Sequence, residues 1–444
     1  MYDTIFAPVT TIGSSAVSIF RISGKDSAKI LKALIKEKKL PVEKKLVLKK
    51  VYHPKSKKEL LDICMICWMP SPNSYTGEDS FEVHCHGGFS TSKAFIDAFS
   101  KVKELRFAEA GEFSKRALIN GKIDLIKAEA VNEIIIAESE NQRNLSVRQL
   151  EKGLSIPVRS WKKQIIKTLS KLEATIDFSD EEAIPEKLFI KDDLNKIINQ
   201  IKKVLKEGKK YDVLVKGLKV VITGSPNVGK SSLFNYIIKK EKSIVTKIAG
   251  TTRDVVDKKI ILKGNPVTFY DTAGIRKTKG LVEKEGIKKA LNVIEEADIL
   301  LTIYDINKVE ENKVSEVTNE KWNIFNKIDK KKNTKRYKDE KKISTYFVSV
   351  KTGEGIKGLL EDISTTIIKK TKELKKEDYF YTNSRQKNDL KKAIENLRLA
   401  NLEKDVEIIA EYLRTAIYNL ERILGKVDIE DVLGEIFSSF CIGK

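Results

Sequence analysis

The stretch VVITGSPNVGKSS, at residues 220–232, decides the fold of the central part of this chain. An apolar run is followed there by a glycine-rich loop and then by a run of helical character, which is the context that a Walker A phosphate-binding loop requires. Gly224 and Gly229 allow the backbone N–H groups to turn toward a β-phosphate, and Lys230 adds a cation. The hydroxyl of Ser231 suits Mg²⁺ as a ligand. These features predict an α/β P-loop domain that binds a nucleoside triphosphate.

Three further signatures follow in the order expected of a guanine-nucleotide domain, namely TTRD at 251–254, DTAG at 271–274 and NKID at 326–329. Thr252 is placed to complete the metal shell, and Asp271 ends an apolar strand where a carboxylate orders the water on the metal. The carboxylate of Asp329 can accept two hydrogen bonds from the ring N–H and the amine of guanine, which adenine cannot supply. The run SVK at 349–351 fits the loop that contacts the guanine oxygen. Together the signatures predict that the chain binds and hydrolyses GTP.

One position departs from the Ras pattern. Ile275 follows DTAG, where Ras-like proteins carry the glutamine that orients the attacking water. Two nearby residues are candidates for the missing role: the amide of Asn227 could hold a monovalent cation against the phosphates, and Glu283 could orient water. The residues alone leave a simpler interpretation open, in which Asn227 caps the loop and Glu283 is an exposed helical carboxylate.

Composition bounds the class of protein. A chain of 444 residues is too long for one core and predicts two or three domains. Four cysteines, with no charged-then-apolar leader and no apolar run near about eighteen residues, predict a reduced, cytoplasmic protein without a membrane span. The formal net charge of +21 attracts phosphate backbones, but the lysines are spread along the whole chain. The charge therefore leaves open whether the surface contacts RNA or is only solvated and lysine-rich.

Changes in pattern divide the chain into four segments. Residues 1–119 alternate short apolar runs with turn clusters and predict a small α+β domain. Residues 120–212 and 373–444 are helical in character, and they flank the P-loop domain at residues 213–372. Pro157 and Pro185 mark interruptions in the first helical segment. This order predicts one helical domain into which the GTPase domain is inserted.

Cys64, Cys67, His84 and His86 resemble a zinc-binding set, because they supply a CxxC pair and two imidazoles. However, Cys64 and Cys67 lie in an apolar run of strand character, where residues three apart face opposite sides. A buried strand and one or two polar histidines account for the same residues. We therefore expect no metal at these positions.

Outside the P-loop domain, six stretches carry a family resemblance: FRISG at 20–24, PNSYTGED at 72–79, HGG at 86–88, AGEFSKRALINGKIDLIKAEAV at 110–131, DFSDEE at 177–182 and FSSFCIGK at 437–444. With the central signatures, they resemble the MnmE (TrmE) family of tRNA-modification GTPases over essentially the whole chain. The resemblance implies an N-terminal domain that binds folate and forms a homodimer, a helical domain, and an inserted GTPase that potassium stimulates.

The resemblance also implies a reaction and its partners. Members of the family work with an FAD-containing MnmG-like protein, in a heterotetramer or larger assembly, on the wobble uridine of certain tRNAs. They install a carboxymethylaminomethyl or related aminomethyl-type group on carbon five, with the carbon taken from a 5-formyl or methylene derivative of tetrahydrofolate. A second class of function stays open, an RNA-binding GTPase switch in ribosome assembly, which has no reason to hold folate.

Carried over position by position, the resemblance strengthens both catalytic candidates. Asn227 belongs to the implied potassium site, and Glu283 is the implied catalytic glutamate. The implied metal ligands are Asn227, Thr246, Ile248 and Thr251 for potassium, and Ser231 and Thr252 for magnesium. The implied nucleotide contacts are Asn227, Val228, Gly229, Lys230, Ser231, Ser232, Thr246, Lys247, Ile248, Ala249, Gly250, Thr251, Thr252, Asp271, Thr272, Ala273, Gly274, Asn326, Lys327, Asp329, Ser349, Val350 and Lys351.

The implied folate contacts come from both ends of the chain: Arg21, Glu82, Lys122 and Lys444. Guanidinium and ammonium groups pair with the carboxylates of a folate, and a carboxylate accepts from the amine and ring N–H groups of a pterin. Cys441 occupies the tail cysteine position of the family, where a nucleophilic role and a structural or partner-contact role both stay open. The segment TTIGSSA at 10–16 departs from the family's proline- and glycine-rich pattern, so backbone contacts there are not carried over.

Overall fold

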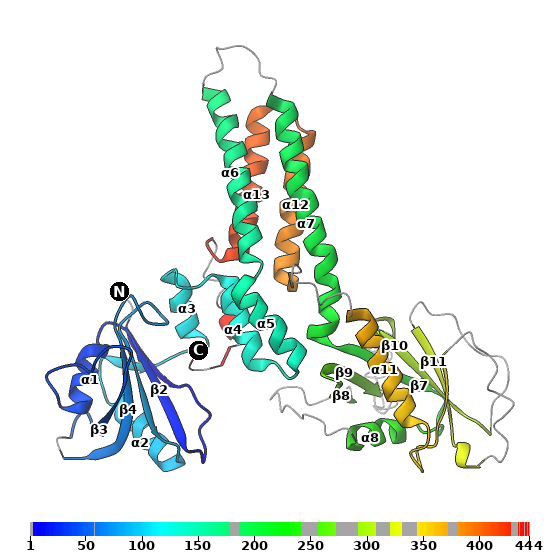
Figure 1. The fold of residues 1–444 in the computed structure, drawn as a ribbon, viewed down its shortest axis with the longest axis horizontal. Helices are drawn as coiled ribbons and strands as arrows, with labels where there is room; N and C mark the ends of the chain where they lie inside the picture. Colours follow the sequence, from blue (N-terminus) through cyan, green and yellow to red (C-terminus); the bar gives the residue numbers. More distant parts are fainter. Residues whose placement is uncertain are drawn as a thin grey trace, which may run out of the picture. The chain divides into compact units, whose positions relative to one another are not determined.

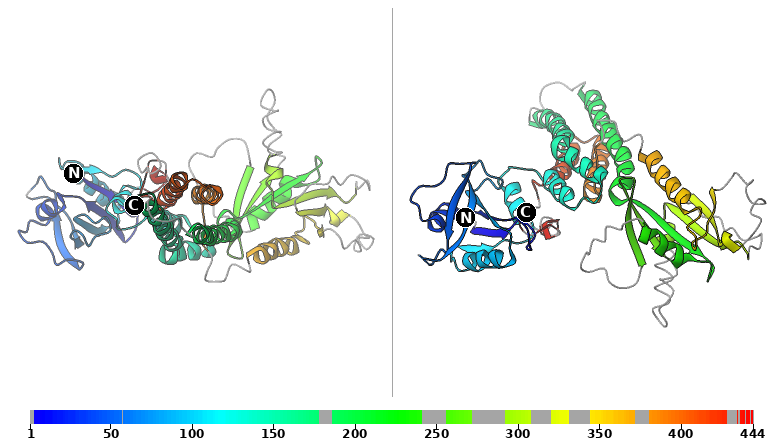
Figure 2. Two further views of the ribbon diagram at one scale, coloured as in Figure 1. Left: turned by 90° about the horizontal axis from the view of Figure 1, so that it is seen from above. Right: turned by 60° about the horizontal axis from the view of Figure 1, so that its bottom comes forward.

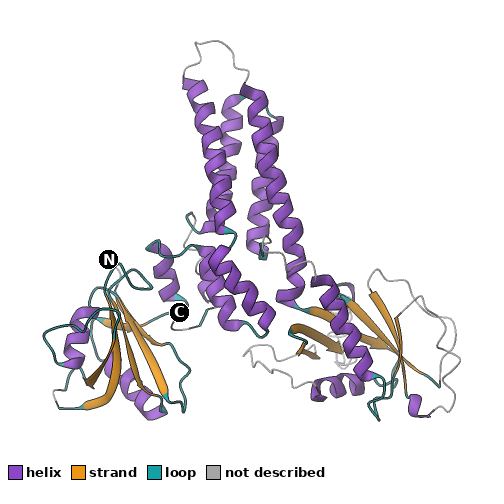
Figure 3. Ribbon diagram, viewed as in Figure 1, coloured by secondary structure: helices purple, strands orange, loops and turns teal. Residues whose placement is uncertain are grey.

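A computed structural model of the protein describes residues 3–56, 58–177, 186–240, 256–271, 292–307, 320–330, 344–371, 380–427, 434, 436–438, 440, 441 and 443. The chain divides into two compact units. One comprises Met1–Asn132, Gln149–Asn199 and Asn383–Lys444, and the other comprises Glu133–Arg148 and Gln200–Thr382. The predicted fold class is confirmed, because an α+β domain is followed by a helical region into which a P-loop-type α/β sheet is inserted in the chain (Figures 1 and 3).

The N-terminal part of the first unit is a six-stranded sheet of order β3-β4-β5-β2-β1-β6. Its strands are β1 (Thr4–Pro8), β2 (Val17–Ser23), β3 (Leu46–Tyr52), β4 (Leu60–Met69), β5 (Ser80–His86) and β6 (Leu105–Phe107). The pairing of β1 with β6 is parallel, and the other pairings are antiparallel. Along β2, Phe20 and Ile22 are buried while Arg21 between them is half-buried, because successive side chains point to opposite faces.

Helices α1 (Ser27–Ile35) and α2 (Phe89–Ser100) pack on the buried face of this sheet. The rings of Phe20 and Phe95 are stacked there, with centroids 5.5 Å apart, and Leu31 of α1 belongs to the same core. Apolar packing therefore fixes the face of the sheet that α1 and α2 cover, here called the inner face. The opposite, outer face carries the candidate ligand-binding residues Arg21 and Glu82.

The helical region consists of α3 (Glu112–Ile119), α4 (Leu125–Ile136), α5 (Glu140–Lys152), α6 (Ser155–Asp177), α7 (Glu186–Lys216), α12 (Ser384–Leu402) and α13 (Val406–Leu424). Helices α6 and α13 lie side by side in every view and are joined by the ion pair of Lys162 with Glu421 (Figures 1 and 2). The break between α5 and α6 falls at residues 153–154, and Pro157 follows in the first turn of α6, where a proline is tolerated. Within the described residues, no helix is long and apolar enough to span a bilayer.

The second unit contains a six-stranded sheet of order β12-β11-β10-β7-β9-β8 (Figure 1). Its strands are β7 (Leu218–Gly224), β8 (Val256–Leu262), β9 (Asn265–Asp271), β10 (Ile299–Asp305), β11 (Glu320–Asn326) and β12 (Ser344–Phe347). All neighbours are parallel except β8, which runs antiparallel to β9. Helices α8 (Lys230–Lys240) and α11 (Ile356–Thr371) pack on one face.

The strand order of this sheet fixes where a ligand can bind. Strand β7 has β9 on one side and β10 on the other, so the direction of the winding reverses at β7. In open parallel sheets, ligands bind outside the carboxyl ends of the strands at such a reversal. The loop that follows β7 is the glycine-rich loop at 225–229, so the sheet places the predicted phosphate loop at its binding edge.

Candidate functional site

The loop between β7 and α8 has the geometry of a phosphate-binding loop. Gly224 and Gly229 have φ angles of 142° and 105°, which residues with a side chain rarely adopt. A Cβ atom on Gly224 would lie 2.3 Å from the carbonyl oxygen of Ile303, and one on Gly229 would lie 2.3 Å from Nδ2 of Asn326. The backbone therefore curls closely against its neighbours. Because α8 begins directly after this loop, the N–H groups of its first turn favour an anion there.

Lys230 provides the cation of this loop. Its Nζ donates to the carbonyl oxygens of Gly224 at 3.0 Å and Ser225 at 2.8 Å, so the ammonium lies over the loop. Ser231 follows in the first turn of α8, and the buried Asp271 ends β9, the strand beside β7. A hydroxyl and a carboxylate are oxygen ligands that Mg²⁺ accepts, so the described residues fit that ion.

Asn326, at the end of β11, joins three loops. Its side chain is buried, and Nδ2 donates to the carbonyl oxygen of Val228 in the phosphate loop at 2.9 Å. Its Oδ1 accepts from the backbone N–H groups of Lys327 at 2.8 Å and Val350 at 3.2 Å. Both ends of the side-chain amide thus bond to backbone groups of neighbouring loops, so Asn326 holds these loops together.

Asp329 is the residue of the NKID loop that faces solvent. It is exposed on a single 3₁₀ turn (Ile328–Lys330), and one of its oxygens, Oδ1, accepts from the hydroxyl of the buried Ser349 at 2.7 Å. The same hydroxyl accepts from the N–H of Thr352 at 3.2 Å, which fixes its direction. Ser349 thus orients the carboxylate, and Val350 and the exposed Lys351 follow it in the adjoining loop.

Asp305, at the end of β10, contacts the NKID loop as well. Its Oδ2 accepts from Nζ of Lys327 at 2.7 Å, and its Oδ1 accepts from the N–H and the Nδ2 group of Asn307, both at 3.1 Å. Burial raises the pKa of Asp305, but the hydrogen bonds from Lys327 and Asn307 outweigh it and leave the pKa lowered. Sequence reasoning missed Asp305, although it ends the apolar run ILLTIYD as Asp271 ends its own strand.

Several predicted residues of the nucleotide site lie outside the described residues. They are Thr246, Lys247, Ile248, Ala249, Gly250, Thr251 and Thr252 before β8, and Thr272, Ala273, Gly274 and Glu283 after β9. Of the four predicted potassium ligands, the structure describes Asn227, which is exposed and has a left-handed φ of 64°.

A second group of predicted residues lies in the N-terminal sheet. Arg21 of β2 and Glu82 of β5 are paired in the sheet register, and Nε and Nη2 of Arg21 both donate to Oε1 of Glu82, at 2.9 and 2.8 Å. The other oxygen of Glu82 lies 3.2 Å from Nε2 of His84. The guanidinium carbon of Arg21 lies 5.5 Å from the ring centroid of Tyr75 and 5.7 Å from that of Phe113. The pair offers a donor and an acceptor side by side among aromatic rings.

Lys122 reaches the same region through the loop between β4 and β5. Its Nζ donates to the carbonyl oxygen of Pro72 at 2.7 Å. Nearby, Nδ2 of Asn120 donates to the carbonyl oxygen of Thr76 at 2.7 Å, so the end of α3 holds both halves of that loop. Gly77 has a φ of 79° and leaves room for the Lys122 side chain, since an added Cβ would lie 3.2 Å from it. The loop that carries Tyr75 is thus fixed from the side of Lys122.

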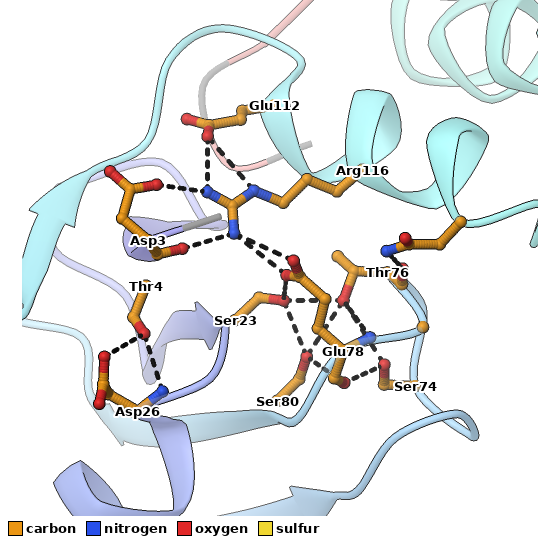
Figure 4. Close-up of polar contacts among 12 residues, drawn as sticks. Asp3, Thr4, Ser23, Asp26, Ser74, Thr76, Glu78, Ser80, Glu112 and Arg116 are labelled. Carbon is orange, nitrogen blue, oxygen red and sulfur yellow. Dashed lines mark hydrogen bonds and ion pairs between the residues drawn. The ribbon is translucent and has the colours of Figure 1, made fainter. Parts of the chain in front are cut away.

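Arg116 of α3 anchors the other side of this loop (Figure 4). Its side chain is 2% exposed and donates to Oε2 of Glu78 at 3.1 Å, to Oε1 of Glu112 at 2.8 Å, and to the carbonyl oxygen of Asp3 at 2.7 Å. Glu78 also accepts from the hydroxyl of Ser23 at 2.7 Å. A buried guanidinium is stable only with such a set of acceptors, so Arg116 ties β2, the β4–β5 loop and α3 into one frame.

The charges in this cluster stabilise one another. Burial raises the pKa of Glu112, but hydrogen bonds from Arg106 and Arg116 outweigh that effect and lower it below its usual range. The residue types around Arg116 did not predict its burial, because an arginine in a helix is ordinarily exposed.

The C-terminal segment packs against the N-terminal domain. Phe437 and Phe440 are buried with their ring centroids 4.8 Å apart, and they share a core with Leu118 of α3 and Leu125 of α4. Two large rings in one apolar cluster hold the segment in place.

Beyond those rings, the tail contacts the start of α3 and the end of β1. The N–H of Gly111 donates to the carbonyl oxygen of Cys441 at 3.4 Å, and a Cβ on Gly443 would lie 2.5 Å from the carbonyl oxygen of Pro8. Pro8 ends β1, which pairs with the strand that carries Arg21. Cys441 itself is exposed. Lys444 lies outside the described residues.

The cysteines and histidines considered as a zinc set are spread over both faces of the sheet. Cys64 is buried in the core and Cys67 is half-buried on the other face, as strand alternation predicts. Burial raises the pKa of Cys64 well above its usual value. His86 pairs with Asp62, whose Oδ1 lies 2.9 Å from Nδ1 of the imidazole. In the part of the chain that the structure describes, no three His, Cys, Asp or Glu side chains form a group that could hold a metal ion.

Comparisons with known proteins cover nearly the whole chain. The family model described as "GTP-binding protein TrmE N-terminus" matches residues 4–122, and the model described as "MnmE helical domain" matches residues 125–441. The two matches meet at α3 and α4, where the first sheet passes into the helical region.

Curated relatives match over their full length. Proteins called "tRNA modification GTPase MnmE" from Rickettsia rickettsii (strain Sheila Smith) and Rickettsia conorii (strain ATCC VR-613 / Malish 7) are each 36% identical over 449 residues, covering 100% of both chains. The protein of that name from Rickettsia prowazekii (strain Madrid E) is 36% identical over 451 residues with the same coverage.

Proposed function

This chain belongs to the MnmE family of tRNA modification GTPases, which work with MnmG in wobble-uridine modification, and we propose that it couples potassium-stimulated GTP hydrolysis to a folate-dependent step of that reaction. The observation that supports the proposal most is the joint presence of two sites in one chain. One is the phosphate loop with its NKID contacts. The other is the Arg21–Glu82 pair, whose strand β2 pairs with β1, and the tail lies against the end of β1.

In the nucleotide site, each described residue has a separate task. Lys230 and the first turn of α8 would neutralise phosphate oxygens. Ser231 would be a ligand of Mg²⁺ and Asp271 would order a water on that ion, which would offset negative charge on the phosphates. Thr252 is the further proposed ligand of that ion. Asp329, held by Ser349, accepts from guanine and so selects GTP over ATP.

The potassium site is proposed to replace the missing glutamine. Ile275 cannot orient water, whereas the exposed amide of Asn227 stands at the edge of the phosphate loop, where a cation would offset charge on the phosphates. Thr246, Ile248 and Thr251 complete the proposed ligand set, and Glu283 is proposed to orient the attacking water.

Potassium stimulation is tested by the rate of GTP hydrolysis in K⁺ and in Na⁺. We expect the full-length protein to turn over severalfold faster in K⁺, and the Asn227→Ala variant to lose that difference. An exposed substitution in the same unit, Glu361→Ala, should keep it. Equal rates in the two salts would remove potassium from the mechanism.

The folate site is proposed to use Arg21, Glu82, Lys122 and Lys444, with Cys441 close by. The described residues fit a reduced folate, because the Glu82 carboxylate can accept from a pterin amine and the guanidinium and ammonium groups can pair with folate carboxylates. A folate held here would supply the one-carbon unit. Arg21→Ala should weaken binding of 5-formyltetrahydrofolate about tenfold or more by calorimetry, since it removes a charge-assisted bond. Arg414→Ala, on the exposed side of α13, is the matched control.

A homodimer is proposed through the outer face of the first sheet. Leu46 and Leu48 of β3 and Ile63 and Met65 of β4 are exposed there, by 52%, 64%, 44% and 37%, and Leu48 pairs with Met65 in the register. A contiguous exposed apolar patch on a sheet face supports a protein partner, and a second copy of the chain brings the same patch. Leu48→Glu should yield a monomer by light scattering, whereas Phe89→Glu, at the similarly exposed first residue of α2 and outside the patch, should not.

The remaining partners are proposed from the family alone. They are an FAD-containing MnmG-like protein, in a heterotetramer or larger assembly, and tRNA, all in the cytoplasm. The net charge of +21 favours a phosphate-backbone partner. Mass spectrometry of tRNA nucleosides from a deletion strain, with and without complementation, tests the modification on carbon five of the wobble uridine. A wild-type protein that binds no reduced folate and leaves these nucleosides unchanged would instead favour an RNA-binding GTPase of ribosome assembly.

A further inference from the structure

Asp305 stands outside the four nucleotide signatures, yet it is built into the nucleotide edge of the second sheet. It ends β10, the strand beside β7, and its side chain is 8% exposed. Its two oxygens have different partners. Oδ1 accepts from the N–H and the side-chain amide of Asn307, which shapes the local turn, whereas Oδ2 accepts from Nζ of Lys327 at 2.7 Å. The second contact joins β10 to the NKID loop.

Lys327 carries the connection onward to the phosphate loop. The same Nζ donates to the carbonyl oxygen of Asn227 at 3.0 Å. Both residues are strained, because Asn227 has a φ of 64° and Lys327 a φ of 70°, and left-handed backbone is uncommon for residues other than glycine. Strained conformations persist only where the surroundings hold them. The ammonium group of Lys327 supplies such a contact, because it links the backbone of Asn227 to the side chain of Asp305.

We infer that Asp305 is a positioning residue, which holds the ammonium of Lys327 against the carbonyl of Asn227 and so fixes the phosphate loop and the base loop relative to one another. Loss of the Asp305 charge should therefore weaken GTP binding. It should also raise the potassium concentration needed for half-maximal activity, because Asn227 is a proposed potassium ligand. This second effect rests on the proposed function, and the first does not.

The alternative is that Asp305 only shapes the turn after β10. The two roles separate in Asp305→Asn, since an asparagine keeps a side-chain oxygen that can accept from Asn307 but lacks the charge that binds an ammonium. The tether from Asn326 to Val228 is independent of Asp305 and stays in place in this variant. The substitution therefore tests the ion pair without removing the loop.

The experiment uses the full-length protein with GTP and a non-hydrolysable GTP analogue. We expect Asp305→Asn to bind the analogue about tenfold more weakly and to need severalfold more K⁺ for half-maximal hydrolysis, with thermal stability close to that of the wild type. Asp298→Asn is the matched control, because Asp298 lies just before the opposite end of β10, where Oδ2 accepts from the N–H of Lys219. It should leave both quantities unchanged.

A double-mutant cycle with Lys327→Met decides whether Asp305 acts through the lysine. If it does, the double variant should bind the analogue no more weakly than Lys327→Met alone. Additive losses, or wild-type affinity in a folded Asp305→Asn protein, overturn the inference. A wild-type protein without potassium stimulation would instead contradict the proposed potassium site, and the affinity measurement would still test the role of Asp305.

Discussion

The backbone N–H of Gly111 donates to the carbonyl oxygen of Cys441 at 3.4 Å, so the end of the chain is held against the start of α3. Gly443 follows against Pro8, at the end of the strand that pairs with β2. A site composed of Arg21, Glu82 and the last residues of the chain is therefore compatible with the described backbone. The tail should then matter for folate and not for GTP.

Gly443→Ala tests this relation with a single methyl group. The residue has a φ of 97°, and the added Cβ would lie 2.5 Å from the carbonyl oxygen of Pro8, so the tail must move. We expect reduced-folate affinity to fall about tenfold by calorimetry, comparable to the loss of one charge-assisted contact, while GTP turnover is retained. Gly434→Ala is the control, since nothing lies within 4 Å of its added Cβ. Unchanged folate binding in Gly443→Ala would separate the tail from the site.

Asp329→Asn should change the base preference of the nucleotide site. The substitution replaces an acceptor by a donor opposite the guanine amine, so GTP affinity should fall by at least about a hundredfold. Affinity for xanthosine triphosphate should rise in the same variant, because the xanthine oxygen can accept where the guanine amine donates. Competition binding with the two nucleotides measures both effects. A variant that keeps its GTP preference would show that NKID does not read the base.

Glu283→Ala should separate binding from turnover. A residue that orients water acts in the transition state, so kcat should fall by about a hundredfold or more while the dissociation constant for GTP stays close to that of the wild type. Single-turnover hydrolysis and nucleotide binding on the same preparation measure the two quantities. An equal loss in both would assign Glu283 to ground-state binding instead.

Asp389→Asn should stabilise the helical region at neutral pH. Asp389 is buried in α12, and its Oδ2 has no hydrogen-bond partner among the residues that the structure describes. Arg385 and Arg422 approach it only to 3.8 and 3.7 Å, beyond hydrogen-bonding distance, so burial raises the pKa of Asp389 despite these charges. The raised pKa means that the folded state is favoured below the usual Asp pKa of about 3.9 and loses that advantage as the pH rises.

The asparagine variant cannot ionise, so it does not lose folded-state stability as the pH rises. We expect a gain of roughly 1 kcal/mol in unfolding free energy at pH 7, which shrinks as the pH falls toward about 4. Thermal melts across this range measure it, with the exposed Glu395→Gln of the same helix as control. A variant that is less stable than the wild type at pH 7 would show that Asp389 is held as a charged partner of the arginines.

The P-loop sheet could be predicted from sequence because three of the nucleotide signatures, the Walker A loop, DTAG and NKID, stand at the ends of apolar strands. The pairing of Arg21 with Glu82 could not be predicted from the residues alone, since β2 and β5 are adjacent only through the sheet order. Arg116 gave no signal either, because its burial depends on carboxylates from distant segments. Asp305 did carry a signal, as the end of a strand at the binding edge, and its role needed the contact with Lys327 to become visible.

The boundaries of the four predicted segments stay a prediction. Helix α7 runs from Glu186 to Lys216 without a break, and the two compact units separate within it, between Asn199 and Gln200. A helix keeps the same apolar period on both sides of such a boundary, so periodicity cannot locate it. Packing partners, and not the local pattern, decide to which unit each turn belongs.

The partnership of α6 with α13 has a consequence for biosynthesis. Ile165 and Leu172 of α6 are buried in the bundle, and Arg414 of α13 pairs with Glu173 at 2.8 Å, but the whole P-loop sheet is encoded between the two helices. At about 5–20 residues per second, α13 leaves the ribosome roughly ten to fifty seconds after α6. The sheet from β7 to β12 is continuous in the chain and can fold during that interval, whereas the bundle cannot close. In a nascent chain the apolar side of α6 therefore waits tens of seconds for α13, which makes this helix a segment that a ribosome-associated chaperone could protect.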